Sequence, residues 1–560
     1  MLSATTFAQI RPVEPDHEAV LGRYDALALR VRDADGAGEA IAAIEAWDAL
    51  RREIRSWEAM ASLRFQQATG DPDRKADVDR SNERKPVYAS RDADVKRAAL
   101  ASPHRAAIAA AFGEHALALW ACDVEAVDER IVAHLAAENA LEDEYVAMLG
   151  GARIPFAGSE YSLPGIAAFG EDADRAVREA AARAKWAYYD AHRDDLDRIY
   201  DGLVRERTAA ARALGYADFT PLGYRRLRRT DYGPEDVARL RDEVVREIVP
   251  LCARIAAAQA RAIGVDRLMP WDVDVYDAAE RLRPPAGDGL TTAGRAALAA
   301  TAPAFGAFAD MMFAGGLHDL PIRDGKAGGG FCTSFPTYGL PFVYANCNGT
   351  THDVNVLVHE LGHAFQCHES RDKRLSDYLW PTFEACEINS MGMEFLVRPH
   401  LEAFFGEGAE RYRRRHLASS LMLLPYGCAV DHFQHLVYAS PGATPAERNA
   451  MWRECESRYL PWRVAGGIAH IENGGFWQQQ RHIYASAFYY IDYVMAMSCA
   501  LQFWTASLED AGDAIARYIA LCKRGGEAPF GALARSAGLR PPFDGGVFAE
   551  IAARASDALF

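Results

Sequence analysis

The sequence lacks the features of several common classes of protein. Its 560 residues contain no run of about 18 apolar residues, so we expect no membrane-spanning helix. Acidic residues outnumber basic ones, 78 to 62, and a net charge of −16 argues against nucleic-acid binding, which needs a basic surface. The N-terminal residues have neither the basic start nor the apolar stretch of a secretory signal. We therefore expect neither a membrane nor a nucleic acid as a partner.

Cysteine is present, but not in a pattern with specific chemistry. The 10 cysteines are scattered, and no two form the C-x-x-C spacing of zinc or redox sites. Scattered thiols in a long chain without a signal are typical of reduced proteins, so we expect a cytoplasmic location. Gly328 to Gly330 likewise lack the spacing of a phosphate-binding loop. The candidates for site chemistry are therefore histidine and glutamate.

One stretch, residues 353–370 (DVNVLVHELGHAFQCHES), has a pattern with a mechanism. It contains an H-E-x-x-H motif, and apolar residues at three-and-four spacing predict a helix around it. His359 and His363 would lie on one helical face and offer two imidazole nitrogens to one zinc ion. Glu360 could then act as general base toward water at the metal. The alternative is two ordinary histidines on a buried helix.

A third zinc ligand is expected downstream, because catalytic zinc usually keeps three protein ligands and one open position. Residues 381–396 (PTFEACEINSMGMEFL) are typical of a buried helix, where a carboxylate is costly unless it is paired or bound to metal. The candidates there are Glu384, Glu387, Ser390 and Glu394. Cys367 and Cys386 also lie near in sequence, but as thiolates they would suit a structural zinc site better than a hydrolytic one.

Two β-prone segments, residues 331–335 and 342–347, directly precede the motif helix. An edge strand beside a catalytic metal can bind the substrate backbone by strand addition. We take FVYANCNGT, which starts at residue 342, as that strand, with Val343, Tyr344 and Ala345 as substrate contacts. The alternative is a small structural hairpin.

A second segment, residues 474–504, carries side chains with polar ends among mostly apolar residues. It holds His482, Tyr489, Tyr490 and Tyr493. Aromatic runs are usually core, but buried polar tips need partners, and a site that hydrolyses an amide needs donors aimed at the developing oxyanion.

The rest of the chain is expected to be mainly helical scaffold, with residues 150–165 as a loop or short hairpin. Residues 70–86 (GDPDRKADVDRSNERKP) have little to bury and predict an exposed loop or a break between helices. Four arginines would either hold a peptide carboxylate or, more often, pair with nearby acids: Arg225, Arg226, Arg228 and Arg229. His432 and His435 have no carboxylate at useful spacing, so we interpret them as structural.

These segments occur together, in order, in one known family. The chain resembles the M3 family of zinc oligopeptidases, specifically the oligoendopeptidase F branch with its Pz-peptidase-like members. The resemblance covers most of the chain, including EDEYVAMLGGARIPFAG, KAGGGFCTSFP, HELGH, PTFEACEINSMGMEFL, VDHFQHLVY, GGFWQQQRHI and FYYIDY. Two departures are Gln366, where many members carry histidine, and Ala487, where relatives often have proline. Neither position is a proposed ligand.

The resemblance implies a mainly α fold, in which two helical lobes enclose a deep substrate channel. A small β-sheet is expected beside the zinc helix, as in zincins. We divide the chain into an N-terminal helical lobe, residues 1–190, and a catalytic domain, residues 191–560.

The family's zinc is held by two histidines and by a glutamate that a second glutamate follows seven residues later. These positions match His359, His363 and Glu387, with Glu394 as the second glutamate. Glu360 matches the base. Glu394, Ser390 and Glu384 are the candidates for orienting the histidines from behind.

The groups that stabilise the tetrahedral intermediate match His482, Tyr490 and Tyr493. Tyr489 could take one of these parts and is otherwise expected to contact the substrate. The implied activity is that of a metallo-endopeptidase with one zinc ion per chain, cutting internal bonds of short unfolded peptides. One alternative is a carboxypeptidase or dipeptidyl-carboxypeptidase on the same scaffold. Another is a noncatalytic peptide-binding protein with structural zinc, although a closed structural site would not need Glu360. No oligomeric state is predicted.

Overall fold

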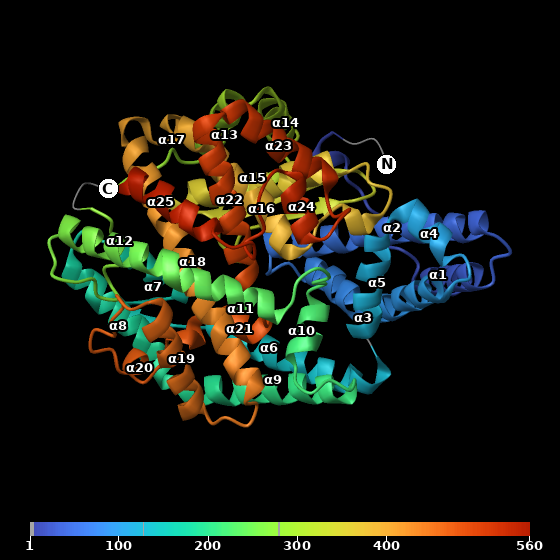
Figure 1. The fold of residues 1–560 in the computed structure, drawn as a ribbon, viewed down its shortest axis with the longest axis horizontal. Helices are drawn as coiled ribbons and strands as arrows, with labels where there is room; N and C mark the ends of the chain where they lie inside the picture. The colour runs from blue at the N-terminus through green and yellow to red at the C-terminus, as the bar shows by residue number, and fades with distance from the viewer. Residues whose placement is uncertain (1–4, 127, 278–280) are drawn as a thin grey trace.

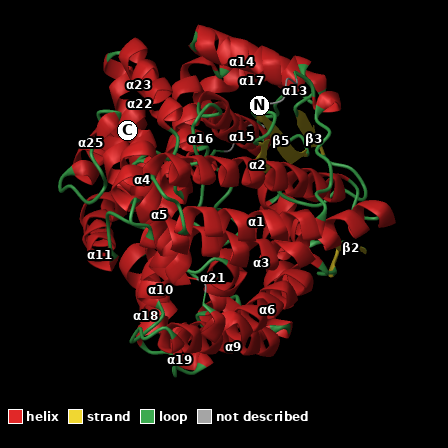
Figure 2. Cartoon of the chain, turned by 90° about the vertical axis from the view of Figure 1, so that its right-hand side faces the viewer, coloured by secondary structure: helices red, strands yellow, loops and turns green. Residues whose placement is uncertain are grey.

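The computed structural model describes residues 5–126, 128–277 and 281–560. The fold is mainly helical, with two small sheets, as predicted (Figures 1 and 2). The first helices extend to the right in Figure 1. They are α1 (His17–Arg32), α2 (Ala37–Gln67), α3 (Pro72–Ala101), α4 (Arg105–Phe112) and α5 (Glu114–Ala126). These helices enclose a separate hydrophobic core around Trp47 and Trp120, which Leu375 and Tyr378 complete from a distant part of the chain.

The predicted break at residues 70–86 is wrong for most of its length, because the chain leaves the helix only before Pro72, and residues 72–86 form the first half of α3. The Asp71 side chain accepts hydrogen bonds from the backbone N–H groups of Asp73 and Arg74, and so caps the helix. Pro72 occupies the first turn, where its missing N–H costs nothing. The segment has few apolar residues, yet α3 packs against α1, α2 and α5. Capping and tertiary packing therefore outweigh the weak apolar pattern.

Much of the next part of the chain lies in the lower half of Figure 1. It contains α6 (Val132–Gly150), α7 (Leu163–Ala167), α8 (Arg175–Ala191), α9 (Arg193–Ala213), α10 (Thr220–Arg226), α11 (Pro234–Glu243) and α12 (Val249–Ala262). The predicted hairpin is present as the antiparallel pair β1 (Ile154–Phe156) and β2 (Ser159–Tyr161). Tyr145 of α6 and Trp186 of α8 pack into a larger hydrophobic core, to which most of the later helices also contribute. The predicted domain boundary near residue 190 stays a prediction, and this packing favours an earlier division.

The second sheet follows α13 (Asp288–Thr301) and α14 (Pro303–Ala314). Its strands are β3 (His318–Pro321), β4 (Phe331–Phe335) and β5 (Leu340–Cys347), in the order β3-β5-β4. β5 pairs in parallel with β3 and antiparallel with β4. Both edges of β5 are therefore occupied. The prediction that Val343, Tyr344 and Ala345 form a substrate-binding edge strand is wrong, since they lie fully buried in the central strand. The strand at the edge beside the motif helix is β4.

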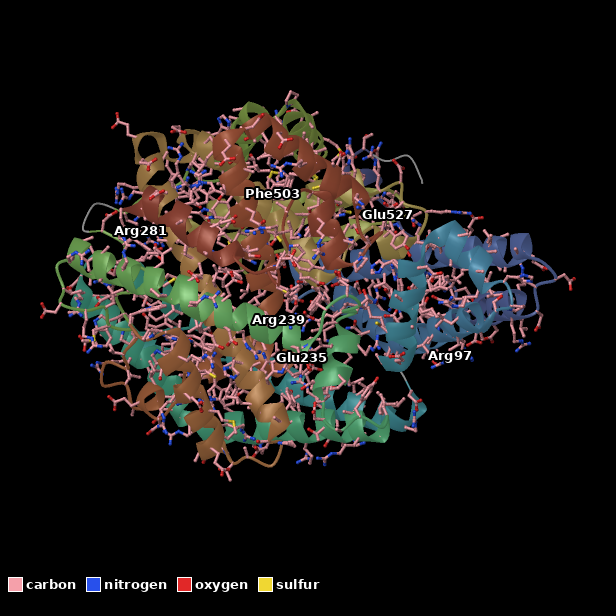
Figure 3. All side chains as sticks on the ribbon, viewed as in Figure 1. Arg97, Glu235, Arg239, Arg281, Phe503 and Glu527 are labelled. Carbon is pink, nitrogen blue, oxygen red and sulfur yellow. The ribbon has the colours of Figure 1, made fainter. Side chains whose placement is uncertain are left out.

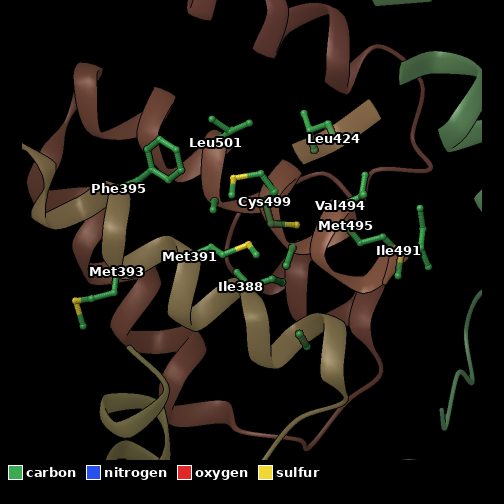
Figure 4. Close-up of a cluster of buried hydrophobic side chains, with 14 of the residues drawn as sticks. Ile388, Met391, Met393, Phe395, Leu424, Ile491, Val494, Met495, Cys499 and Leu501 are labelled. Carbon is green, nitrogen blue, oxygen red and sulfur yellow. The ribbon is translucent and has the colours of Figure 1, made fainter. Parts of the chain in front are cut away.

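The motif helix α15 (His352–Glu369) packs on this sheet and against α16 (Phe383–Val397). The C-terminal helices are α17 (Glu402–Phe405), α18 (Ala409–Ala439), α19 (Pro445–Tyr459), α20 (Ala469–Glu472), α21 (Arg481–Ala485), α22 (Ile491–Glu509), α23 (Ala511–Arg524), α24 (Phe530–Ser536) and α25 (Val547–Leu559). α22 lies along α16, and the contact is sealed by buried apolar side chains such as Ile388, Met391, Val494 and Met495 (Figure 4). This packing brings the tyrosine-rich segment before α22 beside α16.

Charged side chains cover the outside of the molecule (Figure 3). Arg97, Glu235 and Arg239, which Figure 3 labels, are exposed on the outer faces of α3 and α11. In the described ranges, no single helix is long and apolar enough to cross a membrane. α4 and α5, which are bent by 113° at their junction, pass the same test only as a pair.

Candidate metal centre

α15 presents the two histidines of the motif on one face, as the spacing predicts. Their rings are nearly perpendicular, with centroids 4.9 Å apart. The helix forms because Val354, Leu357 and Leu361 bury an apolar stripe against the sheet and neighbouring helices. The polar end of each ring is thereby turned away from the core and toward α16.

Glu387 of α16 completes a set of three metal-ligand atoms, all within 4.8 Å of one another. Its Oε2 lies 3.2 Å from Nε2 of His359 and 3.5 Å from Nε2 of His363. A tetrahedral zinc with bonds of about 2.0–2.1 Å holds its ligand atoms about 3.3–3.4 Å apart. The donor set and its spacing therefore fit zinc.

The close approach of the two helices depends on Gly362, inside the motif. A Cβ at this position would lie 2.7 Å from the backbone of Asn389 and Ser390 on α16. Real Cβ contacts are not this short, so any larger residue would push α16 away. Glycine at this point is what lets Glu387 reach the two imidazoles.

Glu394 orients His359 and is itself hydrogen-bonded to His416, a residue that the sequence analysis did not identify. Nδ1 of His359 lies 2.8 Å from one oxygen of Glu394, and Nε2 of His416, on α18, lies 2.7 Å from the other. Burial opposes the charge on Glu394, but these two hydrogen bonds lower its pKa to about 2. A carboxylate on Nδ1 leaves Nε2 of His359 free for the metal.

The other two proposed ligands, Glu387 and His363, are each contacted by a smaller side chain. The Ser390 hydroxyl donates to Oε2 of Glu387 at 2.8 Å, so Ser390 orients the glutamate rather than a histidine. The Sγ atom of Cys386 lies 3.4 Å from Nδ1 of His363. A thiol thus stands behind the second histidine where a carboxylate stands behind the first, and Cys386 contacts the ligand set without belonging to it.

His416→Ala tests the support that the sequence did not reveal. Loss of the His416 hydrogen bond should weaken zinc binding by about 10–100-fold, the range for partners behind a metal ligand. Chelator competition measures the zinc affinity. His432→Ala is the matched control on α18, because His432 contacts Tyr459 and not the ligands. Equal zinc affinities for the two variants would show that His416 only fills space.

Glu360 points to the same region as the ligands and keeps one oxygen free. The residue is 7% exposed, and Oε2 has no hydrogen-bond partner among the described residues. Its Oε1 lies close to Gly330, just before the edge strand β4, since a Cβ added to this glycine would be 3.7 Å from that oxygen. Burial raises the pKa of Glu360, which makes it a stronger proton acceptor than an exposed glutamate.

His482 and the tyrosines come together beside the ligands, as predicted. Tyr493 Oη lies 3.5 Å from Nε2 of His482, and the Tyr490 ring lies edge-on to the His482 ring at 5.0 Å. Tyr489 takes another part, since its hydroxyl donates to Oε1 of Glu387 at 3.1 Å. Tyr489 thus supports the third ligand, while Tyr490 and Tyr493 stay with His482.

A chain of hydrogen bonds sets the tautomer of His482. The Tyr426 hydroxyl donates to Oε1 of Gln480 at 2.7 Å, so the amide nitrogen of Gln480 is the atom that faces Nδ1 of His482, also at 2.7 Å. An amide nitrogen donates, which leaves the ring proton on Nε2, toward Tyr493. Burial, followed by the charge of Arg481, lowers the pKa of His482 to about 4, so the ring is neutral at pH 7.

Glu384 lies apart from the ligands, although it is three residues before Glu387. It is buried, accepts a hydrogen bond from Thr382 at 3.0 Å, and faces the ion pair of Arg229 with Asp492. Burial and then the charge of Asp492 raise its pKa, which favours the neutral carboxyl group. The structure therefore does not place Glu384 behind either histidine.

The four arginines near residue 227 pair with acidic side chains of the protein, which was the alternative to binding a peptide carboxylate. Arg225 pairs with Glu125, Arg226 with Glu138, Arg228 with Asp123 and Arg229 with Asp492. His432 and His435 are also structural, since they contact Tyr459 and Asp431 respectively. None of these groups belongs to the metal centre.

Cavities lie between the N-terminal helices and the rest of the molecule. One of about 670 Å³ reaches from α3 and α6 to Tyr489, the tyrosine that supports Glu387. Two smaller ones, of about 290 Å³ each, adjoin Trp380, and one of them is lined by Thr333 and Ser334 of β4. Arg55 of α2 lines all three. Space for an extended ligand thus runs beside the edge strand.

Comparison with known proteins shows which family the chain resembles over most of its length. The sequence matches the peptidase M3 N-terminal domain over residues 7–127 and peptidase family M3 over residues 168–287 and 305–552. A structure of Pz peptidase A with an inhibitor is 38% identical, with 99% of each chain covered and a TM-score of 0.94. A putative oligoendopeptidase F is 39% identical, with 99% of each chain covered and a TM-score of 0.94.

A putative oligoendopeptidase F from Bacillus anthracis is 34% identical, with 100% of this chain and 98% of that chain covered and a TM-score of 0.90. No curated protein matches the chain. The predicted family is confirmed: the chain belongs to peptidase family M3, in its oligoendopeptidase F-like branch, and is a peptidase.

Proposed function

We propose that this peptidase is a zinc-dependent endopeptidase that cuts internal bonds of short, unfolded peptides. The observation that carries the proposal is the set of His359, His363 and Glu387 at tetrahedral spacing, with a free oxygen of Glu360 close by. One zinc per chain is the corresponding stoichiometry, and it would supply Lewis acidity that acidifies water and polarises a carbonyl. The ten unpaired thiols support a cytoplasmic location.

Glu360 would move the protons of the reaction. Its free oxygen accepts a proton from the attacking water and later delivers that proton to the leaving amine. The raised pKa suits both steps, because a group must first accept and then release the proton near neutral pH. The low exposure of Glu360 limits competition from bulk water.

His482 and the tyrosines would stabilise the oxyanion that forms at the carbonyl. The neutral His482 ring carries its proton on Nε2, as the Tyr426–Gln480 chain requires, and the Tyr493 hydroxyl is a second donor. Tyr490 lies against the same ring and is the third candidate. Fixed donors of this kind need little reorganisation during the reaction.

Tyr493→Phe tests this assignment. The variant should lower kcat by about 10²–10³, the range for loss of one oxyanion donor, and change KM much less. Tyr24→Phe, in the separate N-terminal core, is the matched control. An unchanged kcat in Tyr493→Phe would make the hydroxyl a packing group only.

The substrate backbone would pair with β4, the edge strand that starts next to Glu360. β4 is short and lies under the N-terminal helices, whose α2 packs against it. An extended peptide fits such a covered edge, whereas a folded protein does not. This is the basis for proposing short, unfolded substrates.

Product analysis of one blocked peptide of about ten residues tests the function. The peptide carries an acetylated N-terminus, its C-terminus is a free acid in one assay and an amide in a parallel one, and mass spectrometry identifies the products. We expect internal cuts that a chelator abolishes and added zinc restores. Removal of only one or two C-terminal residues would favour a carboxypeptidase or dipeptidyl-carboxypeptidase. The absence of hydrolysis of both the free acid and the amide would favour a peptide-binding protein.

A further inference from the structure

A separate cavity of about 490 Å³ lies among α8, α12 and α18 and the segments at 268–276 and 460–479. It shares no lining residue with the three cavities that Arg55 lines. Its volume lies in the range of small-ligand pockets, about 300–1,000 Å³. None of the catalytic groups proposed above lines it.

This cavity borders the metal centre along α18. His416, which holds Glu394, is followed on the same helical face by Ser419, Leu423 and Tyr426, and these three line the cavity. Tyr426 begins the hydrogen-bond chain to His482. His416 and Tyr426 are about 15 Å apart along the helix, a span that about four or five extended residues cover. A peptide held at the metal would need at least that length to place its end in the cavity.

Aromatic side chains form much of the wall. Trp186, Trp271, Trp462 and Phe476 line the cavity together with Tyr426. Large flat rings around an enclosed space favour a large apolar group and disfavour a small or strongly hydrated one. The cavity thus has the composition of a pocket for a Phe-, Leu- or Met-like side chain.

One cation in the cavity, Lys185, forms no ion pair among the described residues, although it feels the negative charge of Asp274. Lys185 Nζ donates to Oε1 of Gln479 at 2.8 Å, and no carboxylate lies within 4.0 Å of it among the residues that the structure describes. Arg463, the neighbouring cation, is held by Glu456 at 3.3 Å and lies 3.5 Å above the Phe476 ring. Lys185 is therefore the group left to meet an anion. Asp274 also lines the cavity and would oppose that anion.

We propose that this cavity binds the carboxyl-terminal residue of the peptide substrate, with a large apolar side chain against the aromatic walls and the terminal carboxylate on Lys185. The inference rests on the proposed peptidase function and narrows the substrate class to short peptides that end in a large apolar residue. Cleavage would then occur a few residues before that end. Such anchoring fixes the position of the cut without requiring a recognised side chain at the cut itself.

The test is a binding measurement that does not depend on turnover. Three eight-residue peptides are used: one ending in Phe as the free acid, the same peptide as the amide, and one ending in Gly as the free acid. Dissociation constants are measured by tryptophan fluorescence on zinc-loaded Glu360→Gln protein and on the Glu360→Gln/Lys185→Met double variant. Lys75→Met in the same background is the control, because Lys75 pairs with Asp79 on the surface of α3.

With Lys185 present, amidation should weaken binding about tenfold or more, the range for a hydrogen bond to a charged group. The Phe-to-Gly change should weaken it by a similar factor through lost apolar burial. In the Lys185→Met variant, the dissociation constants of the acid and the amide should differ by no more than about twofold. Amidation and the Lys185→Met substitution remove the same interaction, so their effects do not add. Asp274→Asn should leave the preference for the acid intact or increase it.

Equal binding of acid and amide to protein with Lys185, or an unchanged preference in Lys185→Met, would overturn the proposal. A fourth peptide is amidated and carries an interior Glu. If its dissociation constant for protein with Lys185 equals that of the free acid, Lys185 binds a side-chain carboxylate instead, and this result would also overturn the proposal. Lys185→Gln and the thermal unfolding midpoint of each variant guard against misfolding. Failure of hydrolysis in the wild type would count against the proposed function, while these binding constants would still decide the role of the cavity.

Discussion

Glu360→Gln should retain zinc and lose about 10²–10⁴ of kcat/KM, the range that a positioned general base contributes. Glutamine has nearly the same shape, so it preserves the packing around position 360, which is 7% exposed. It cannot accept the proton from water. The loss should therefore appear without a change in zinc content, measured by metal analysis and by hydrolysis of a quenched fluorescent peptide.

Glu369→Gln is the matched control, because Glu369 ends the same helix and lies away from the ligands. It should retain near-normal activity. If Glu360→Gln kept near-normal activity with zinc bound, the assignment of Glu360 as the base would be wrong. If it lost zinc as well, the effect on activity could not be credited to proton transfer.

Glu387→Ala should weaken zinc binding by more than about a hundredfold, because loss of a ligand must exceed the 10–100-fold effect of its supports. Glu384→Ala removes a glutamate from the same buried helix but should change zinc affinity little. Glu384 contacts Thr382 and faces Arg229 with Asp492, not the imidazoles. Chelator competition on both purified variants gives the comparison.

Glu384→Ala should instead alter stability, since it removes a buried carboxyl group that faces a charged pair. The thermal unfolding midpoint reports that change separately from zinc affinity. The opposite ranking, with Glu384→Ala the weaker zinc binder, would mean that the third ligand has been wrongly chosen.

The metal centre could be predicted from sequence because its parts follow local rules. The four-residue spacing of His359 and His363 fixes their relation on any helix, and the buried helix that carries Glu387 and Glu394 has a plain apolar pattern. Sequence alone left Glu384 and Glu387 as alternatives, and the resemblance to M3 oligopeptidases selected Glu387. The geometry around α16 separates them physically, since only Glu387 faces the imidazoles.

Other features depend on tertiary contacts that spacing does not encode. Val343 to Ala345 have the pattern of a strand, but their place in the centre of the sheet is set by pairing with β3, which no local signal reveals. His416 and Lys185 belong to no motif, because the contact of His416 with Glu394 and the proposed role of Lys185 both depend on how α18 and α8 pack in the folded chain. The error at residues 70–86 has the same origin, because α3 is held mainly by its cap and by its neighbours.

The most direct test of the account is zinc titration of the metal-free protein, with cleavage of an internally quenched peptide, supplied both as the free acid and as the amide, as the readout. We predict that activity rises linearly and saturates at one zinc per chain, with cuts at internal bonds, and that His363→Ala shows no such rise. A protein that binds one zinc at this site and still cuts no peptide bond would contradict the account.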